Sequence, residues 1–435
     1  MQTIQQLRSG ELKGSKILKL SCELTEFPKE IFELKDTLEI LDLSNNHLSS
    51  LPNNFSDFKK LKIAFFSDND FVSFPEVLAK CPSLTMIGFK SNKINHIPEN
   101  AFPVDLQWLI LTNNRITEIP KSIGKAHKLQ KVAFAGNQIK ALPIEMANCK
   151  NLELLRIAAN QLTEFPQWLL SLPRLSWLAY AGNPFSKTQY IKDELPLIEW
   201  KDLSLKEILG QGASGVISKA TWQTSLTQKE IAVKVFKGEV TSDGFPEEEM
   251  NACIAAGNHN HLVTVIGKLK NHPEQKMGLV LELIPPSFKN LAGPPSFDTC
   301  TRDTFKEGTQ FSSETILKIS QSIADAAKHL HSKGIMHGDL YAHNTLFDDK
   351  ANTIFGDFGA ATLYDLNDKN AAYMEKLDVR AFGCLMEDLL NCPAKDNDSV
   401  ILRNLLTELK DKCMHEEILS RPNFSDIINY LNTFC

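Results

Sequence analysis

The sequence has no long hydrophobic run and no large excess of charge of one sign. No segment of its 435 residues approaches 18 uninterrupted apolar residues. The formal net charge of −6 is spread over a large surface and gives no broad basic field. The first residues, MQTIQQLRSG, lack the charged, apolar and small-residue order of a secretory signal. We therefore expect a cytoplasmic protein with neither nucleic acid nor a membrane as a partner.

Closely spaced cysteine pairs are also missing. The nine cysteines are scattered along the chain and form no C-x-x-C pair. Such a set predicts neither a structural zinc site nor a disulfide framework, and most of these thiols are expected to be small buried hydrophobes. The hydrophobic fraction of 43% and the charged fraction of 23% are those of a folded protein. The length allows two domains of about 200 residues each.

The first half of the chain is periodic. Segments of the form L-x-x-L-x-L-x-x-N recur, and the clearest is LEILDLSNNHLSSLP, from Leu38 to Pro52. Successive asparagines are 23, 23, 22, 23, 23 and 23 residues apart. Each unit predicts a short strand with inward leucines and a turn in which the asparagine bonds neighbouring backbone groups. The asparagines are Asn46, Asn69, Asn92, Asn114, Asn137, Asn160 and Asn183.

This spacing, with a proline near the end of most units, resembles the intracellular class of leucine-rich repeats over about residues 15 to 190. An earlier degenerate unit puts Glu23 at the phase of the asparagines and is expected to form the N-terminal cap. We expect a leucine-rich-repeat domain of about eight repeats over residues 1–190, a linker over 191–203 and a second domain over 204–435.

In that family the strands line a concave face that binds proteins. The strand positions beside the second leucine are expected to point outward there, and three of them, Asp42, Lys131 and Arg156, are charged. An apolar groove needs a cover, so this face predicts a docking surface for a protein substrate, a regulator or the second domain. Packing of the apolar side chains against one another is the alternative. These apolar residues are Ile63, Phe65, Met86, Trp108, Ile110, Leu154 and Trp177.

The second half opens with a glycine-rich turn. Gly210, Gly212 and Gly215 form a G-x-G-x-x-G pattern, which a dinucleotide-binding fold could share. The residues from Val216 to Trp222 read as a strand, where a dinucleotide fold needs a helix. The pattern therefore predicts a strand-turn-strand flap whose glycines let the backbone approach phosphate.

A lysine in an apolar strand follows. Lys234 stands in IAVKVF, 19 residues after Gly215, and a charge in such a strand needs a partner. Nucleotide phosphates would supply one partner, and Glu249 on the next helical segment would supply another. Glu247 and Glu248 compete for that role.

The most specific pattern is IMHGDLYAHNTLF followed by TIFGDFGAA. Asp339 precedes Asn344 by five residues and Asp357 by eighteen. With the glycines and Lys234 before it, this order resembles the catalytic core of eukaryotic-type protein kinases from about residue 204 onward. The expected fold class is thus an α/β leucine-rich-repeat solenoid followed by an α+β, bilobal protein-kinase-like fold.

The kinase resemblance implies ATP and Mg²⁺ as cofactors and gives the residues roles. Asp339 would accept the proton of the substrate hydroxyl, Lys234 would orient the α- and β-phosphates, and Asn344 and Asp357 would hold magnesium. VLEL, ending at Glu282, resembles the adenine-contacting hinge. The ATP-binding residues it implies are Gly210, Gln211, Gly212, Gly215, Ile217, Ala232, Lys234, Glu249, Leu281 and Glu282.

Further marks of the family are structural. His337 and Phe358 fit an internal hydrophobic column, and Asp378 begins a segment that matches a buried helix bracing the catalytic loop. Arg421 fits a motif near the family's end, and Glu375 is a candidate partner for it because the chain lacks the A-P-E sequence that normally supplies one.

Two catalytic-loop residues depart from the family's pattern. Gly338 replaces the arginine that binds a phosphorylated activation segment, so we expect regulation by the repeats or no regulation. Tyr341 replaces a lysine that touches the transferred phosphate in serine/threonine kinases. The segment between Gly359 and Asp378 is short, which reduces the usual platform for a peptide.

The leading hypothesis is an ATP-dependent protein kinase acting on serine or threonine, with tyrosine left open, whose repeats bind the substrate or regulate the kinase. The alternatives are a small-molecule kinase, which shares the H-x-D-x-x-x-x-N loop, and a catalytically weak or inactive kinase-like scaffold. The glycine-rich turn and the repeats argue against the first, and the retention of all four catalytic residues argues against the second.

Overall fold

The computed structural model describes residues 2–186, 195–212, 214–224, 227–238, 240–394 and 399–434. These residues divide into two units. The first comprises residues 1–175 and 183–185, and the second comprises residues 176–182 and 186–435. The predicted order, a repeat stack followed by a mixed sheet with helices, is confirmed.

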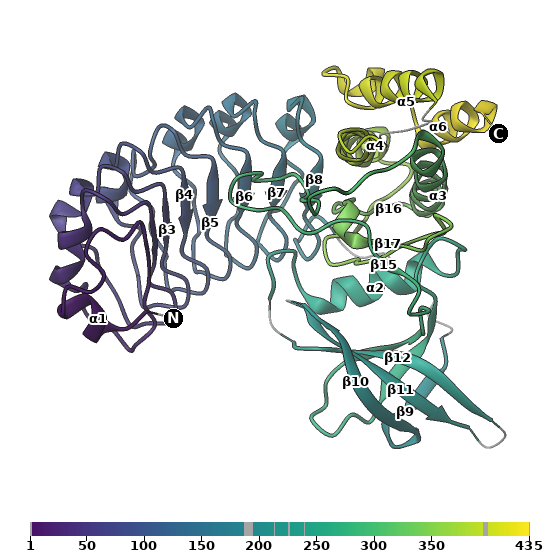
Figure 1. Cartoon of the computed structure of the whole chain (residues 1–435), viewed down its shortest axis with the longest axis horizontal. Helices are drawn as coiled ribbons and strands as arrows, with labels where there is room; N and C mark the ends of the chain where they lie inside the picture. The colour runs from purple at the N-terminus through teal and green to yellow at the C-terminus, as the bar shows by residue number, and fades with distance from the viewer. Residues whose placement is uncertain are drawn as a thin grey trace. The chain divides into compact units, whose positions relative to one another are not determined.

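The first unit is a stack of short parallel strands, each paired with the next along the chain (Figure 1). The strands are β1 (Ile17–Lys19), β2 (Ile40–Asp42), β3 (Ile63–Phe65), β4 (Met86–Gly88), β5 (Trp108–Ile110), β6 (Lys131–Ala133) and β7 (Leu154–Arg156). Helix α1 (Ile4–Arg8) precedes them, and its Thr3 cap accepts a hydrogen bond from the backbone of Gln6.

Short 3-10 helices return the chain between strands, each beginning directly after a proline because proline fixes the backbone angle at that position. They are η1 (Lys29–Leu34), η2 (Asn53–Asp57), η3 (Glu76–Lys80), η4 (Lys121–Lys125), η5 (Ile144–Asn148) and η6 (Gln167–Ser171). The central residue of each strand is fully buried, so the stack has a continuous apolar core. These residues are Leu18, Leu41, Ala64, Ile87, Leu109, Val132 and Leu155.

The asparagines form a second ladder inside the first unit. The side-chain amide of Asn137 donates to the carbonyl oxygens of Leu111 and Phe134, each at 2.9 Å, and its oxygen accepts from the backbone of Ile116. Asn114 and Asn160 make the same bonds one repeat earlier and later. Each asparagine therefore satisfies buried backbone groups of two consecutive repeats.

The second unit begins with β8 (Trp177–Ala179) and contains a six-stranded sheet in the order β10-β11-β12-β14-β13-β9. Its strands are β9 (Leu197–Glu199), β10 (Leu203–Gln211), β11 (Gly215–Gln223), β12 (Gln228–Phe236), β13 (Val265–Lys270) and β14 (Gly278–Glu282), and α2 (Pro246–Ala256) lies between β12 and β13 in the chain. All pairs are antiparallel except β9 with β13.

Part of the predicted linker contributes to this sheet. Residues 197–199 form β9, and residues 200–202 form the 3-10 helix η7 (Trp200–Asp202). Residues 187–194, which hold the rest of the boundary region, lie outside the described residues.

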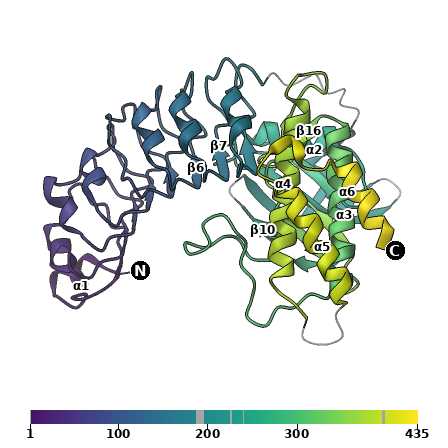
Figure 2. The ribbon, with the colours of Figure 1, turned by 90° about the horizontal axis from the view of Figure 1, so that it is seen from above.

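The remainder of the second unit is mostly helical. Figure 2 shows α3 (Ser313–Ser332), α4 (Ala371–Leu390), α5 (Val400–Cys413) and α6 (Phe424–Leu431) packed side by side. Short strands between α3 and α4 carry the loops of the predicted site. They are β16 (Ile335–Met336), β17 (Thr345–Phe347), β18 (Thr353–Phe355) and β19 (Thr362–Leu363), with β15 (Lys289–Asn290) paired to β17. Three further 3-10 helices are η8 (Ala342–Asn344), η9 (Ile418–Ser420) and η10 (Asn432–Phe434).

Candidate active site

The hairpin of β10 and β11 carries the predicted glycines at its turn. Gly215 packs closely against β12, because a Cβ atom there would lie 2.6 Å from the carbonyl oxygen of Val235. A Cβ atom on Gly210 or Gly212 would meet nothing within 4 Å. Gln211 between them is exposed at the end of β10. A ligand can therefore approach the backbone on the open side of this turn.

The other predicted nucleotide-binding positions lie on neighbouring strands of the same sheet. Ile217 pairs with Lys234 across β11 and β12, and Ala232 pairs with Leu281 across β12 and β14. Ala232 and Leu281 are buried, whereas Glu282 at the end of β14 is exposed. These positions thus combine buried apolar side chains with the buried ammonium of Lys234.

Lys234 forms an ion pair with Glu249 of α2. Among the three adjacent glutamates, Glu249 is the one that is buried, whereas Glu247 is exposed. Burial lowers the pKa of Lys234, but the charges of Glu249 and Asp357 raise it more, so the ammonium stays protonated. Two carboxylates from different parts of the chain therefore act on the same lysine.

The loop between β16 and β17 contains Asp339 and Asn344. The amide of Asn344 donates to the Asp339 carboxylate at 2.7 Å and to its backbone carbonyl at 3.0 Å, which orders the loop. His337 precedes them and is fully buried, with its ring 4.1 Å from that of Phe355 and 5.3 Å from that of Phe358. Burial lowers the pKa of His337, so the ring packs as a neutral group.

Asp357 follows β18 and has a left-handed backbone with φ of 61°. Such a conformation is uncommon for a residue other than glycine and is often found at functional sites. Its carboxylate accepts a hydrogen bond from the backbone of Gly359 at 3.2 Å.

Asp378 of α4 holds the backbone of the Asp339 loop. Its carboxylate accepts from the backbone nitrogens of His337 at 2.8 Å and Gly338 at 3.0 Å. It also lies 2.9 Å from the ring of His331, and it is 1% exposed. The helix thereby fixes the chain immediately before Asp339.

The predicted residues fit a magnesium nucleotide. Asn344 offers an amide oxygen and Asp357 a carboxylate, and Mg²⁺ prefers such hard oxygen ligands together with phosphate. Lys234 supplies a buried cation near Asp357, and the open side of the glycine turn admits phosphate.

Tyr341, at the position where serine/threonine kinases usually have a lysine, is buried and its ring stacks on that of Trp177. The ring centroids are 4.4 Å apart and the planes are inclined by 6°. Trp177 had been predicted to line the concave face of the repeats. The structure groups it with the second unit, where it is 1% exposed.

Glu375 and Arg421 both contact residues in the C-terminal part of the second unit. Arg421 donates to the carbonyl oxygens of His415 and Lys376, and the Glu375 carboxylate accepts from the backbone of Phe424 at 2.7 Å. The Glu375 carboxylate therefore binds the start of α6, whereas the Arg421 guanidinium binds backbone groups of α4 and of the chain that follows α5.

One contact of the loop was not predicted. His343 lies 2.6 Å from the Asp303 carboxylate, whose other oxygen accepts from the His343 backbone at 3.1 Å. Burial lowers the pKa of His343, but the hydrogen bond and charge of Asp303 raise it more, so the pKa lies above its ordinary value. The two residues are forty positions apart, and no local pattern marks Asp303.

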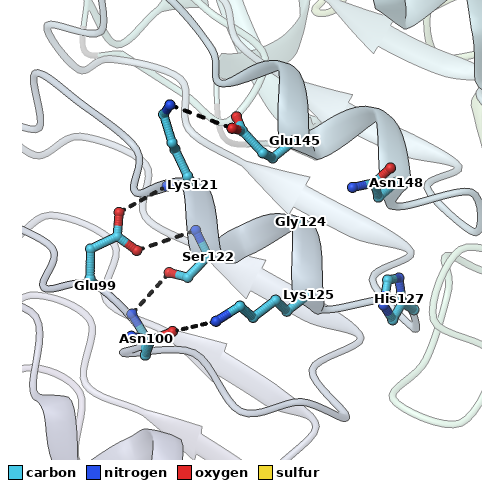
Figure 3. A pocket seen from close by; sticks show the side chains of 9 residues that line it. All are labelled: Glu99, Asn100, Lys121, Ser122, Gly124, Lys125, His127, Glu145 and Asn148. Atoms are coloured by element: carbon cyan, nitrogen blue, oxygen red, sulfur yellow. Dashed lines mark hydrogen bonds and ion pairs between the residues drawn. The ribbon is translucent and has the colours of Figure 1, made fainter.

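A surface pocket of about 450 Å³ lies in the first unit and contains none of the predicted site residues (Figure 3). Its charges are paired: Glu99 accepts from the backbones of Lys121 and Ser122, and Lys121 lies 3.6 Å from Glu145. Because these contacts connect consecutive repeats, the charged side chains of this pocket stabilise the repeat stack. The lining residues are Glu99, Asn100, Lys121, Ser122, Gly124, Lys125, His127, Glu145 and Asn148.

Within the described ranges, no three His, Cys, Asp or Glu side chains gather closely enough to hold a metal ion by themselves. In the same part of the chain, every helix is too short or too polar to cross a membrane.

Comparison with protein families gives two matches. Residues 203–381 match the model described as protein tyrosine and serine/threonine kinase. Residues 37–58 and 105–126 match the model described as leucine-rich repeat. The first match contains Lys234, Asp339, Asn344 and Asp357.

Curated proteins with similar sequences carry kinase names. A probable serine/threonine-protein kinase of Dictyostelium discoideum is 25% identical over 275 residues, covering 54% of this chain and 28% of the relative. Another from the same organism is 28% identical over 304 residues, covering 55% and 49%. A tyrosine-protein kinase receptor of Gallus gallus is 27% identical over 179 residues, covering 39% and 20%. The chain thus spans less than a third of the first of these relatives and about half of the second.

Proposed function

From the premise that this chain combines leucine-rich repeats with a protein kinase domain, we propose that it transfers the γ-phosphoryl group of ATP to serine or threonine hydroxyls of proteins. The observation that carries the proposal is a set of interactions made by Lys234, Asp339, Asn344 and Asp357. Lys234 forms an ion pair with Glu249, and the charge of Asp357 also raises the pKa of Lys234. The amide of Asn344 donates a hydrogen bond to the Asp339 carboxylate. The names of the Dictyostelium relatives favour serine or threonine over tyrosine.

Each of the four residues has a defined task in this proposal. Lys234 orients the α- and β-phosphates, and Asn344 and Asp357 provide oxygen ligands for magnesium. Bound Mg²⁺ supplies positive charge that offsets the charge of the phosphates. Asp339 accepts the proton of the attacking hydroxyl, and Asn344 keeps the Asp339 carboxylate in place through its hydrogen bond.

The ATP pocket proposed here uses the sheet described above. Gly210, Gln211 and Gly212 cover the phosphates with their backbone, because the glycines leave one side of the turn open. Ala232 and Leu281 form the apolar contact for the adenine ring, and Glu282 marks the start of the hinge.

We further propose that the repeats bind the protein substrate or a regulator. The register of β3 to β6 places Ile63, Met86, Trp108 and Lys131 in one row across neighbouring strands. The Lys131 ammonium lies 4.1 Å from the centre of the Trp108 ring, and both side chains are partly exposed, so together they offer an aromatic face and a positive charge. Ile63 and Met86 are only 6% and 5% exposed and form the buried part of the row. A Trp108→Glu variant should raise KM for a protein substrate and leave KM for a short peptide unchanged.

A cytoplasmic location is also proposed. The eight described cysteines are all free, which fits a reducing compartment. No interaction with nucleic acid is proposed, because the net charge of −6 gives no general attraction to phosphate backbones.

The test is incorporation of labelled phosphate from ATP by the purified full chain in the presence of magnesium. Asp339→Asn should lower incorporation by roughly 10²- to 10⁴-fold, the usual contribution of a general base, and should leave nucleotide binding intact. Incorporation that persists unchanged in Asp339→Asn would show a contaminating enzyme and would refute the proposal. Phosphoamino-acid analysis then identifies the acceptor residue.

A further inference from the structure

The segment of residues 176–182, which contains β8, contacts the loop that contains Asp339. Both belong to the second unit. The indole N–H of Trp177 donates to the carbonyl oxygen of Leu340 at 3.1 Å, and its ring stacks on that of Tyr341. Trp177 thus contacts the two residues that follow Asp339, one through the backbone and one through the side chain.

The same strand also approaches the residue before Asp339. Gly338 has a φ of 68°, and a Cβ atom there would lie 2.4 Å from the carbonyl oxygen of Leu178 and 2.9 Å from that of Ala360. Only glycine adopts this backbone without strain and leaves room for both carbonyls. The absence of a side chain at position 338 is therefore what lets the strand lie against the loop.

The residues that flank β8 on either side anchor it on α4. The guanidinium of Arg380 donates to the Ser176 hydroxyl at 2.9 Å, and the Tyr180 hydroxyl lies 3.6 Å from the sulfur of Met374. Tyr180 is 4% exposed and Ser176 is fully buried. Since α4 also holds the loop through Asp378, the loop is fixed to this helix both directly and through the strand.

We propose that Trp177 is a positioning residue for phosphoryl transfer, and that residues 176–182 complete the catalytic loop by holding it on both sides of Asp339. This inference rests on the proposed function and adds to it, since the strand precedes the segment that matches the kinase family model. The contacts described fall on Gly338, Leu340 and Tyr341, whereas the Asp339 side chain is partly exposed and bonded to Asn344. These contacts therefore fix the backbone around Asp339 and leave its carboxylate accessible to a substrate hydroxyl.

Displacement of a catalytic group by about 1 Å can lower a rate by roughly 100-fold. Trp177→Ala removes both the stack and the hydrogen bond, so kcat should fall by about 10- to 100-fold while KM for ATP stays within about threefold. Trp177→Phe keeps an aromatic face on Tyr341 and loses only the indole N–H, so it should restore kcat to within about fivefold of wild type.

A second readout does not depend on activity. Hydrogen exchange of the amides in residues 336–345 should accelerate in Trp177→Ala and return towards wild type in Trp177→Phe. The matched control is Trp168→Ala, a partly exposed tryptophan on η6 in the first unit, which should change neither kcat nor exchange in this loop.

Gly338→Ala tests the contact from the other side with the tryptophan intact, so the conclusion does not depend on whether Trp177→Ala folds. The added methyl group strains the backbone at φ of 68° and must displace the carbonyls of Leu178 and Ala360, and kcat and loop exchange should change as in Trp177→Ala. The double variant should be little worse than either single variant, because both release the same strand.

The outcomes separate the two proposals. Unchanged or increased kcat in Trp177→Ala, or unchanged exchange in residues 336–345, would overturn the positioning role. If the wild type incorporates no more phosphate than Asp339→Asn, the proposed function fails. Hydrogen exchange alone then tests whether residues 176–182 order the loop. That ordering role is wrong if Trp177→Ala leaves the exchange of residues 336–345 unchanged.

Discussion

The ammonium of Lys234 and the carboxylate of Glu249 pair across β12 and α2, with only 13% and 3% of their side-chain surfaces exposed. Removal of one partner from such a buried pair leaves an uncompensated charge, which typically costs 3–5 kcal/mol. We expect Lys234→Met to destabilise the second unit by roughly 3 kcal/mol and to abolish phosphate transfer. Thermal unfolding and the incorporation assay measure the two effects.

The double variant Lys234→Met/Glu249→Gln separates stability from chemistry. It removes both charges, so it should recover much of the lost stability and none of the activity. Lys206→Met is the matched control, because Lys206 pairs with Glu230 on the same sheet at 2.6 Å with 41% and 48% of the side chains exposed. Such an exposed pair contributes about 0–1 kcal/mol. If Lys206→Met and Lys234→Met lowered the stability by equal amounts, the claim that burial makes the Lys234–Glu249 pair costly to break would be wrong.

Phosphorylation of the segment between Gly359 and Asp378 is not expected to control activity. Its hydroxyl residues are Thr362, Tyr364 and Tyr373. Thr362 is 1% exposed, and the Tyr364 hydroxyl lies 2.9 Å from a ring nitrogen of His331. Both hydroxyls are thus engaged in the folded structure.

We therefore predict that phosphatase treatment, or the Tyr373→Phe variant, leaves the rate of incorporation within about twofold of the untreated wild type, an effect of less than about 0.5 kcal/mol on the barrier. Mass spectrometry of the treated protein confirms that phosphate was removed. A loss of activity by tenfold or more that is restored on incubation with ATP would contradict the prediction.

The repeated asparagines and the order of the kinase motifs were enough to predict both folds, whereas the roles of Lys234, Asp339, Asn344 and Asp357 stay predictions. Such features are local, since each asparagine bonds backbone groups of the adjoining repeats and Asp339, Asn344 and Asp357 lie within eighteen residues of one another. The choice of Glu249 over Glu247 depended on which face of α2 meets β12, which adjacent glutamates do not reveal.

Long-range contacts were the features that sequence reasoning missed. The strand β9 pairs with β13 about seventy residues later, although its residues had been assigned to a linker. Trp177 has the periodicity of a repeat strand, yet its ring lies on Tyr341. Asp303 and His343 meet only after the intervening chain has folded. In each case the partner is set by tertiary packing, which spacing along the chain does not encode.

The Asp303–His343 pair should make stability depend on pH. Because the pKa of His343 is raised in the folded state, its contribution is fully present below the unfolded value of about 6.5 and is lost as the pH rises through the folded value. We expect Asp303→Asn to lower the melting temperature more at pH 6 than at pH 9. Proton NMR of the His343 ring should give a titration midpoint above 6.5 in the wild type and a lower midpoint in the variant.

Two further variants control this prediction. His343→Gln should remove the difference between pH 6 and pH 9 that is attributed to the pair. His96→Gln alters an exposed histidine of the first unit and should leave that difference intact. A wild-type midpoint below 6.5 would mean that burial outweighs Asp303, and the predicted pH dependence would then be reversed.

The asparagine ladder should be a local source of stability in the first unit. Asn137→Ala removes one acceptor and two donors from a side chain that is 5% exposed. The Ile116 N–H then loses its partner, whereas the carbonyl oxygens of Leu111 and Phe134 each lose one bond and keep another, from Asn114 and Asn160. The unpaired Ile116 N–H costs about 1–3 kcal/mol and each of the two other lost hydrogen bonds about 1 kcal/mol, so a total near 3 kcal/mol is expected. Native-state hydrogen exchange of strands β5, β6 and β7 is the measurement.

The effect should be confined to neighbouring repeats, because a repeat stack is stabilised by nearest-neighbour interfaces. Amides of β1 and β2 should keep their protection in Asn137→Ala, and Asn95→Ala, which alters an exposed asparagine of an earlier repeat, should change little. Asn137→Asp keeps the size and the acceptor but turns a carboxylate towards the carbonyls of Leu111 and Phe134, so it should destabilise at least as much as alanine. A uniform loss of protection over all strands would instead mean that the first unit unfolds as one cooperative block, and the local account of the ladder would be wrong.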